Sequence, residues 1–263
     1  MVLKVAPALI RLCFRALSCP IVVPRNIYAG LRCSFEKNTD SVVIRDLRTS
    51  GFHIFDNGLD ADTVTLLRED FLANVDDTLV IESNGQATGR HTVVGRQLSP
   101  TTAPLEERFE KIASAYFSTA HVVPELSYYQ YSKPEKDLSD VPGGGFHVDD
   151  HKPNIKFFVY ITDTVLDNGA FSYCAKTHGI WGWRRIIHWW VHHILPLRFF
   201  HYGAKGFFFP RQNLDEIATA IEGKAGTVFV ADTTGFHKAN PVIEGYRQVF
   251  VASYRIRKLK YFE

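Results

Sequence analysis

The sequence is poor in cysteine and nearly balanced in charge. Of its 263 residues only four are cysteines, and Cys13, Cys19 and Cys33 all lie near the N-terminus, apart from Cys174. None shows the paired spacing of a zinc site, and no disulfide framework is expected for the main part of the chain, so a reducing compartment fits. A net charge of +2 is too small to indicate nucleic acid as a partner.

The N-terminal segment, residues 1–38, lacks acidic residues before Glu36 and contains no apolar run long enough to span a bilayer. Arg11 and Arg15 interrupt its apolar residues. Two interpretations stay open: a basic, amphipathic mitochondrial presequence, or an extension that packs on the domain. We therefore expect a cytoplasmic protein, with the mitochondrion as the alternative.

Apolar and aromatic residues, in contrast, are plentiful. Hydrophobic residues make up 46% of the chain and aromatic residues 13%, enough for a sizeable core in one domain over 39–263. Local patterns predict these elements: strands at 42–44, 52–55, 126–132, 155–162 and 226–232; helices from Asp60, over 104–121 and over 213–222; and a loop over 85–102 that includes His91.

The stretch Gly145–His151 carries the strongest chemical signal. On an extended segment His147 and Asp149 point to the same side, because strand side chains alternate. His237, much later in the chain, would complete two imidazoles and one carboxylate around a metal. That facial set leaves three coordination positions open, as in non-haem Fe(II) oxygenases.

Asp150 and Arg247 are two further charged residues close in sequence to these candidate ligands. Asp150 competes with Asp149 for the metal, but the His-x-Asp pattern favours Asp149 and leaves Asp150 facing away, as a candidate for substrate contact. Arg247 follows His237 at the start of the apolar run 248–252. An arginine there can point into the same cavity and hold a carboxylate with its planar fork.

The order of motifs resembles the phytanoyl-CoA dioxygenase family of Fe(II)/2-oxoglutarate enzymes. The resemblance covers about Ser41 to Ile256, and it implies a double-stranded β-helix (a cupin-like jelly roll), mainly β with flanking helices. The motifs that carry it are the His147–Asp149 pair, the strand and turn Ile155–Asp163, the turn Asp167-Asn168-Gly169, the segment Lys176-Thr177-His178, and then His237 and Arg247.

The resemblance also implies cofactor sites. Fe(II) would be held by His147, Asp149 and His237, with 2-oxoglutarate and O2 in the open positions and the far carboxylate of 2-oxoglutarate on Arg247. Ala239 stands where relatives often have a hydroxyl residue. Further contacts are expected from these candidates: Tyr160, Ser253 and Gln130 for the cosubstrate, and Tyr129 for the substrate.

The implied activity is hydroxylation of an unactivated C–H bond in a small organic or lipid-like substrate, with release of succinate and CO2. Two alternatives stay open. One is a metal-dependent enzyme that does not use 2-oxoglutarate, for which Arg247 is the discriminating residue. The other is a non-catalytic jelly-roll protein that binds or scaffolds.

The stretch from Trp181 to Gly203 departs from the rest, because it holds all four tryptophans of the chain. His188 and His192 have helical i, i+4 spacing but lack the glutamate of an HExxH site. We expect a helical insertion at about 180–204 that acts as a lid or contact surface, including contact with lipid through 181–202.

Overall fold

The computed structural model describes residues 41–74, 80–83, 86–95, 102–118, 122–132, 145–149, 154–178 and 214–256. The N-terminal segment 1–38, the Trp-rich insertion at about 180–204, Asp150 and His151 therefore lie outside the described residues. Among the described helices, none is both long and apolar enough to cross a membrane.

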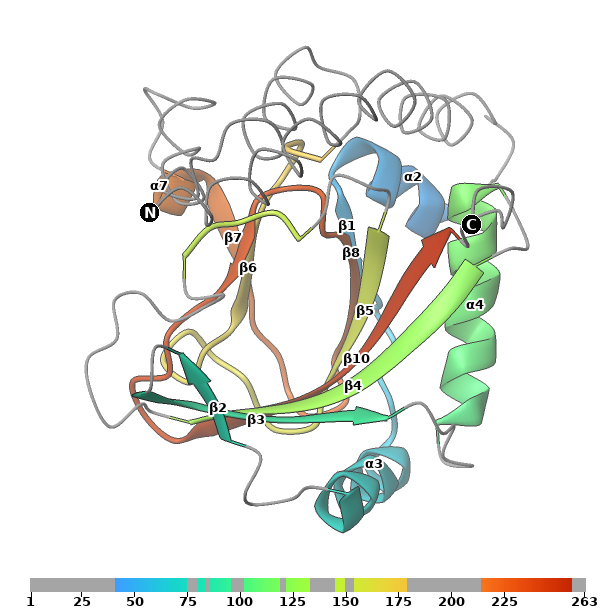
Figure 1. Ribbon diagram of the computed structural model, residues 1–263. Helices are drawn as coiled ribbons and strands as arrows, with labels where there is room; N and C mark the ends of the chain where they lie inside the picture. The colour runs from blue at the N-terminus through green and yellow to red at the C-terminus, as the bar shows by residue number, and fades with distance from the viewer. Residues whose placement is uncertain are drawn as a thin grey trace, which may run out of the picture.

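Two antiparallel sheets form the body of the molecule (Figure 1). The larger sheet has the strand order β1-β8-β5-β10-β4-β3-β2 and the smaller one the order β7-β6-β9. The bounds of the larger sheet are β1 Phe52–Ile54, β2 Val80–Ser83, β3 Gln86–Gly95, β4 Val122–Ser132, β5 Asn154–Tyr160, β8 Val228–Asp232 and β10 Tyr246–Ile256. Those of the smaller sheet are β6 Phe171–Cys174, β7 Ala218–Ile221 and β9 His237–Ala239.

Strand β10 organises the larger sheet, because it pairs with β4 on one edge and with β5 on the other. Its register with β4 runs from Tyr246↔Ser132 to Ile256↔Val122. Alternation along a strand puts odd-numbered residues such as Arg247 and Ser253 on one face and even-numbered residues such as Phe250 on the other. One strand can therefore supply both the core and a site.

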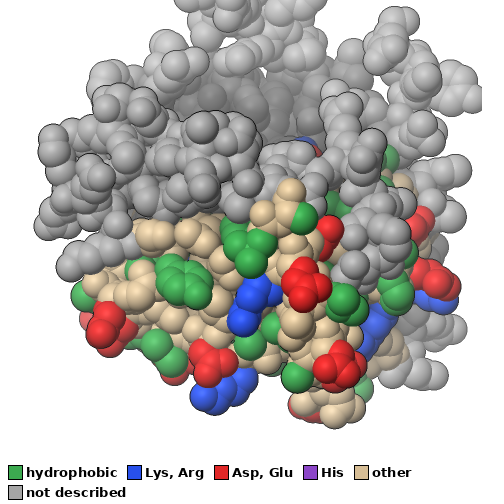
Figure 2. All heavy atoms as spheres, turned by 90° about the horizontal axis from the view of Figure 1, so that it is seen from below, with side chains coloured by type: hydrophobic (Ala, Val, Ile, Leu, Met, Phe, Trp, Pro, Cys, Tyr) green, Lys and Arg blue, Asp and Glu red, His purple; other side chains and the backbone are tan. Residues whose placement is uncertain are grey.

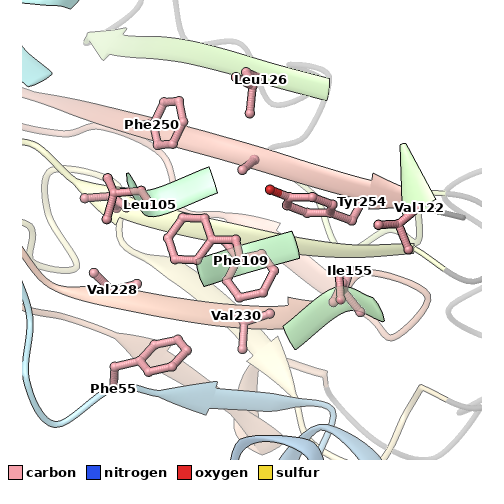
Figure 3. Packing of buried hydrophobic residues seen from close by; sticks show 14 of the residues in the cluster. Phe55, Leu105, Phe109, Val122, Leu126, Ile155, Val228, Val230, Phe250 and Tyr254 are labelled. Atoms are coloured by element: carbon pink, nitrogen blue, oxygen red, sulfur yellow. The ribbon is translucent and has the colours of Figure 1, made fainter. Parts of the chain in front are cut away.

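Helices cover the outer face of the larger sheet. They are α2 Val42–Thr49, α3 Ala61–Asn74 and α4 Ala103–Phe117, with a short α7 Leu214–Ile217 elsewhere. In α4 the side chain of Phe109 is fully buried and stacks on Phe157 of β5, with ring centroids 4.2 Å apart. Figure 3 shows Phe109 among Val230, Ile155 and Tyr254.

A second apolar cluster fills the interior between the two sheets. It joins inward-facing residues of the larger sheet to those of the smaller one: Tyr160, Phe171, Tyr173, Ile221, Phe229, Ala231, Val249 and Val251. This arrangement confirms the prediction of a mainly β fold with flanking helices.

Several local predictions were wrong. Val42–Ile44 opens helix α2 instead of forming a strand, because Ile44 and Leu47 share the buried side of one helical turn. The predicted loop at 85–102 contains strand β3, whose pairing with β4 outweighs its Gly- and Thr-rich composition. The helix predicted over 213–222 ends at Ile217 and continues as β7.

The surface is mixed in character. Figure 2 shows the face that lies at the bottom of Figure 1, where acidic, basic and hydrophobic side chains are interspersed over the coloured residues. This agrees with the small net charge of the chain.

Replacing Phe109 by alanine should lower the free energy of unfolding by about 3–5 kcal/mol, because the stacked ring is lost and a cavity remains. Leu72→Ala is the matched control: Leu72 of α3 is 58% exposed, and its replacement should change the free energy of unfolding by less than about 0.5 kcal/mol. Urea unfolding followed by circular dichroism measures both, and equal values would contradict the packing described.

Candidate metal centre

Backbone pairing brings the two histidines together. The amide of His147 donates to the carbonyl of His237 (2.9 Å), and the amide of His237 donates back to the carbonyl of His147 (3.0 Å). Asp149 N–H donates to the carbonyl of Thr233 at 3.1 Å. The segment 145–149 thus runs antiparallel beside β9, and the two imidazole centroids lie 4.4 Å apart.

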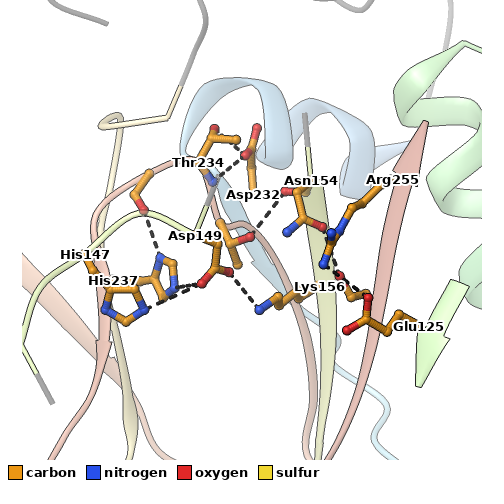
Figure 4. Close-up of polar contacts among 12 residues, drawn as sticks. Glu125, His147, Asp149, Asn154, Lys156, Asp232, Thr234, His237 and Arg255 are labelled. Carbon is orange, nitrogen blue, oxygen red and sulfur yellow. Dashed lines mark hydrogen bonds and ion pairs between the residues drawn. The ribbon is translucent and has the colours of Figure 1, made fainter. Parts of the chain in front are cut away.

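Three side chains converge at this point (Figure 4). Asp149 Oδ1 lies 3.6 Å from Nε2 of His147 and 3.6 Å from Nε2 of His237. Ligand atoms of the three residues all fall within 4.8 Å of one another, a spacing suited to a shared ion. The structure therefore brings together the three predicted ligands.

Each imidazole is turned by its other nitrogen. Nδ1 of His147 lies 2.8 Å from the carbonyl of Gly145, and Nδ1 of His237 lies 2.9 Å from the carbonyl of Gly235. A carbonyl only accepts, so both Nδ1 atoms are assigned as N–H donors, and in a neutral imidazole Nε2 is then the nitrogen with the lone pair. Such partners orient metal-binding histidines, and the donor set fits a divalent metal.

The electrostatics of the site suit coordination as well. Burial lowers the pKa of His237, which favours the neutral imidazole that a metal needs. Burial by itself raises the pKa of the Asp149 carboxyl, but its contacts with His237, His147 and Lys156 hold that pKa well below its usual range. Asp149 is therefore a carboxylate at neutral pH.

Asp232, at the end of β8, shapes the turn that delivers His237. Its Oδ1 accepts hydrogen bonds from the amide (2.9 Å) and the hydroxyl (2.5 Å) of Thr234. Its Oδ2 accepts one from the hydroxyl of Tyr116 in α4 at 2.7 Å. Aspartate commonly closes a turn by bonding the backbone two residues on, and here the turn is also fastened to a helix.

Gly235 in the same turn leaves no room for a larger residue. A Cβ atom there would lie 2.1 Å from the hydroxyl oxygen of Tyr173, which itself donates to the carbonyl of Asp232 at 2.8 Å. The close approach of Tyr173 therefore requires glycine in the turn that leads to His237.

Arg247 is buried in the interior between the sheets. Its guanidinium carbon lies 4.3 Å from the ring centroid of Tyr131, and Nη1 donates to the carbonyl of Gly169. Gly169 has φ +96°, a conformation that glycine adopts without steric cost in the turn after Asn168. Nε of Arg247 is buried without a hydrogen-bond partner among the described residues, so the guanidinium keeps a donor available for an anion.

Tyr160 lies near Arg247, but its hydroxyl is already engaged. It donates to the carbonyl of Ile221 (2.7 Å) and accepts from the amide of Phe171 (3.1 Å). Burial raises the pKa of Tyr160 to about 12, and the charge of Arg247 only partly offsets it. The phenol therefore stays neutral and braces β5 against the smaller sheet.

The other candidates are not all brought to the same place. Tyr129 lies on the inner face beside Tyr131, with ring centroids 6.0 Å apart. Gln130 lies on the opposite face, where its Oε1 accepts from Nε2 of Gln248 at 2.8 Å. Ser253 shares the face of Arg247 farther along β10, and its hydroxyl donates to Oδ1 of Asn154 at 3.0 Å.

Lys156 is a site residue that the sequence analysis missed. Its Nζ lies 2.8 Å from Oδ2 of Asp149, and its side chain is 23% exposed. A lone lysine within the otherwise apolar Ile155–Val159 was the available signal, since buried lysine is rare unless it is paired.

Comparisons with known proteins agree with this fold. No family model and no curated protein match the chain. Among solved structures, the epimerase SnoN in complex with Fe3+, alpha ketoglutarate and nogalamycin RO aligns with a TM-score of 0.56, 17% identity and coverage of 81% of this chain and 82% of that one. HygX from Streptomyces hygroscopicus with nickel, 2-oxoglutarate and hygromycin B bound aligns with a TM-score of 0.51 and 15% identity, over 82% of this chain and 87% of that one. The chain has the fold of these proteins.

A third similar structure is the alpha ketoglutarate dependent carbocyclase SnoK from nogalamycin biosynthesis, with a TM-score of 0.51, 15% identity and coverage of 83% of this chain and 85% of that one. The predicted double-stranded β-helix is thereby confirmed. The narrower resemblance to the phytanoyl-CoA dioxygenase family stays a prediction.

Replacing Asp232 by alanine should release the turn that carries His237 and weaken metal binding by about 10- to 100-fold, as loss of an outer partner typically does. Titration with Co(II), followed by visible absorption, measures the affinity. Asp163→Ala is the control, because Asp163 also holds a turn, through Ala225 N–H at 2.9 Å, but outside the site. Equal Co(II) affinity of the two variants would contradict this role of Asp232.

Proposed function

We propose that this protein is an Fe(II)- and 2-oxoglutarate-dependent oxygenase. The observation that carries the proposal is the facial set of His147, Asp149 and His237, with both Nε2 atoms directed at one carboxylate oxygen. The fold supports it, because SnoN in complex with Fe3+ and alpha ketoglutarate and HygX with nickel and 2-oxoglutarate bound share that fold.

Arg247 supports the choice of 2-oxoglutarate over other metal chemistry. A buried guanidinium with an unpaired Nε is costly unless a ligand completes its hydrogen bonds. A carboxylate is the natural ligand, since the planar fork of arginine matches its two oxygens. Tyr131 beneath the guanidinium and Gly169 beside it hold the fork in place.

The overall reaction then consumes a substrate C–H bond, O2 and 2-oxoglutarate, and gives the alcohol, succinate and CO2. The bound iron and 2-oxoglutarate supply the oxidising chemistry, whereas the chain orients the cosubstrate and surrounds it with apolar side chains. Hydroxylation of a small organic molecule is the outcome we propose. SnoN is an epimerase and SnoK a carbocyclase, so the shared fold also accommodates other oxidations.

Anaerobic addition of Fe(II) and 2-oxoglutarate should produce the weak visible charge-transfer band of the chelate in the wild-type protein. In Arg247→Ala the dissociation constant of 2-oxoglutarate should rise about 10- to 100-fold, the equivalent of roughly 1.5–3 kcal/mol for a charged hydrogen bond. Arg247→Lys keeps the charge but loses the fork, so it should restore only part of the affinity.

Co(II) binding and thermal unfolding serve as controls and should change little in Arg247→Lys. A protein that binds metal but gives no band with 2-oxoglutarate would point to a different metalloenzyme. A protein that binds no metal would point to a non-catalytic jelly roll.

A further inference from the structure

The two carboxylate oxygens of Asp149 have separate partners (Figure 4). Oδ1 faces the Nε2 atoms of both histidines at 3.6 Å. Oδ2 points the other way and forms an ion pair with Nζ of Lys156 at 2.8 Å. Oδ1 is therefore the oxygen placed for a metal, and Oδ2 is already occupied by a cation.

The two partners of this ion pair differ in how firmly they are held. Lys156 belongs to β5, which is hydrogen-bonded to β8 on one edge and β10 on the other. Its neighbours in register, Ser253 and Ala231, are small, so the lysine stem can lean toward Asp149. Asp149, in contrast, lies outside the named strands: its amide donates to the carbonyl of Thr233, and two bonds between His147 and His237 join its segment to β9. The ion pair fastens a loop-borne ligand to a rigid strand.

The number of oxygens that Asp149 offers matters for the proposed chemistry. A carboxylate with both oxygens free can bind a metal through one or both of them. A facial set leaves three positions open only if the carboxylate uses one oxygen. With Fe(II) bound, 2-oxoglutarate and O2 would need these positions, so a second oxygen of Asp149 would compete with them.

We propose that Lys156 is a positioning residue that holds Oδ2 of Asp149 away from the metal. It thereby keeps the coordination positions open for 2-oxoglutarate and O2, an inference that rests on the proposed function. The lysine acts through Asp149 and touches neither the cosubstrate nor the metal. Its removal should therefore affect the binding of 2-oxoglutarate more than the binding of the metal.

The test compares the wild type with Lys156→Met, which keeps the apolar stem, and Lys156→Arg, which keeps the charge and the hydrogen bond. Lys156→Gln is a second variant without the charge. In Lys156→Met the dissociation constant of 2-oxoglutarate with Fe(II) should rise about 10-fold, because a second bond from Asp149 would compete for a position that the cosubstrate needs. The Co(II) dissociation constant should change little, and Lys156→Arg should restore 2-oxoglutarate binding.

Co(II) absorption without 2-oxoglutarate provides an independent measurement, because its visible bands depend on the number of ligands. We expect altered bands in Lys156→Met and wild-type bands in Lys156→Arg. Lys238→Met is the matched control: Lys238 is also a partly buried lysine, ion-paired with Asp215 at 2.5 Å, on the strand that carries His237. It should leave both the bands and 2-oxoglutarate binding unchanged.

Unchanged Co(II) bands in Lys156→Met and Lys156→Gln would overturn the inference, even if 2-oxoglutarate bound more weakly, because the lysine would then act on the cosubstrate directly. If the wild-type protein does not bind 2-oxoglutarate, the proposed function is overturned instead. The Co(II) bands would still decide in that case whether Lys156 sets how Asp149 coordinates.

Discussion

The reciprocal backbone pairing of His147 with His237 is the constraint on which the site depends. These residues are far apart in sequence, and they become neighbours only because the segment 145–149 folds back beside β9. Once their backbones pair, the alternation of the extended segment places Asp149 on the same side. Each imidazole is then oriented by a carbonyl in its own turn. The geometry of the candidate metal centre thus follows from strand pairing and local hydrogen bonds.

The strands of the larger sheet carry an apolar cluster under the helices on one face and the candidate site on the other. On β5, Phe157 faces outward and stacks under α4, whereas Lys156 and Tyr160 face inward. Burial of the outer cluster stabilises the sheet, and the sheet in turn is a rigid frame for the inner side chains. Functional groups built on strands are held more precisely than groups on loops. This explains why Asp149, which lies on a short segment, is tied to a strand by Lys156.

Buried polar groups around the site are mostly satisfied by backbone atoms. Asn240, for example, donates through Nδ2 to the carbonyl of Ala170 and to the hydroxyl of Ser172, both at 2.6 Å. Tyr160 and Tyr173 bond carbonyls across the two sheets. These bonds leave little freedom for rearrangement, because each lost partner costs about 1–3 kcal/mol. The unpaired Nε of Arg247 is therefore an informative exception within the described part of the chain.

The sequence by itself pointed to the three candidate metal ligands and to Arg247, because their signal is a short motif and its order along the chain. It also located the strands β1, β4, β5 and β8 and the helices α3 and α4, since alternation and helical spacing are local properties. Only the tertiary structure decided that Val42–Ile44 is helical, that Gln86–Gly95 pairs with β4, and that Gln130 faces away from Arg247. The ion pair of Lys156 with Asp149 was likewise decided only by the tertiary structure. Each depends on a partner distant in sequence, and strand register, which sets those partners, is a property of the whole sheet.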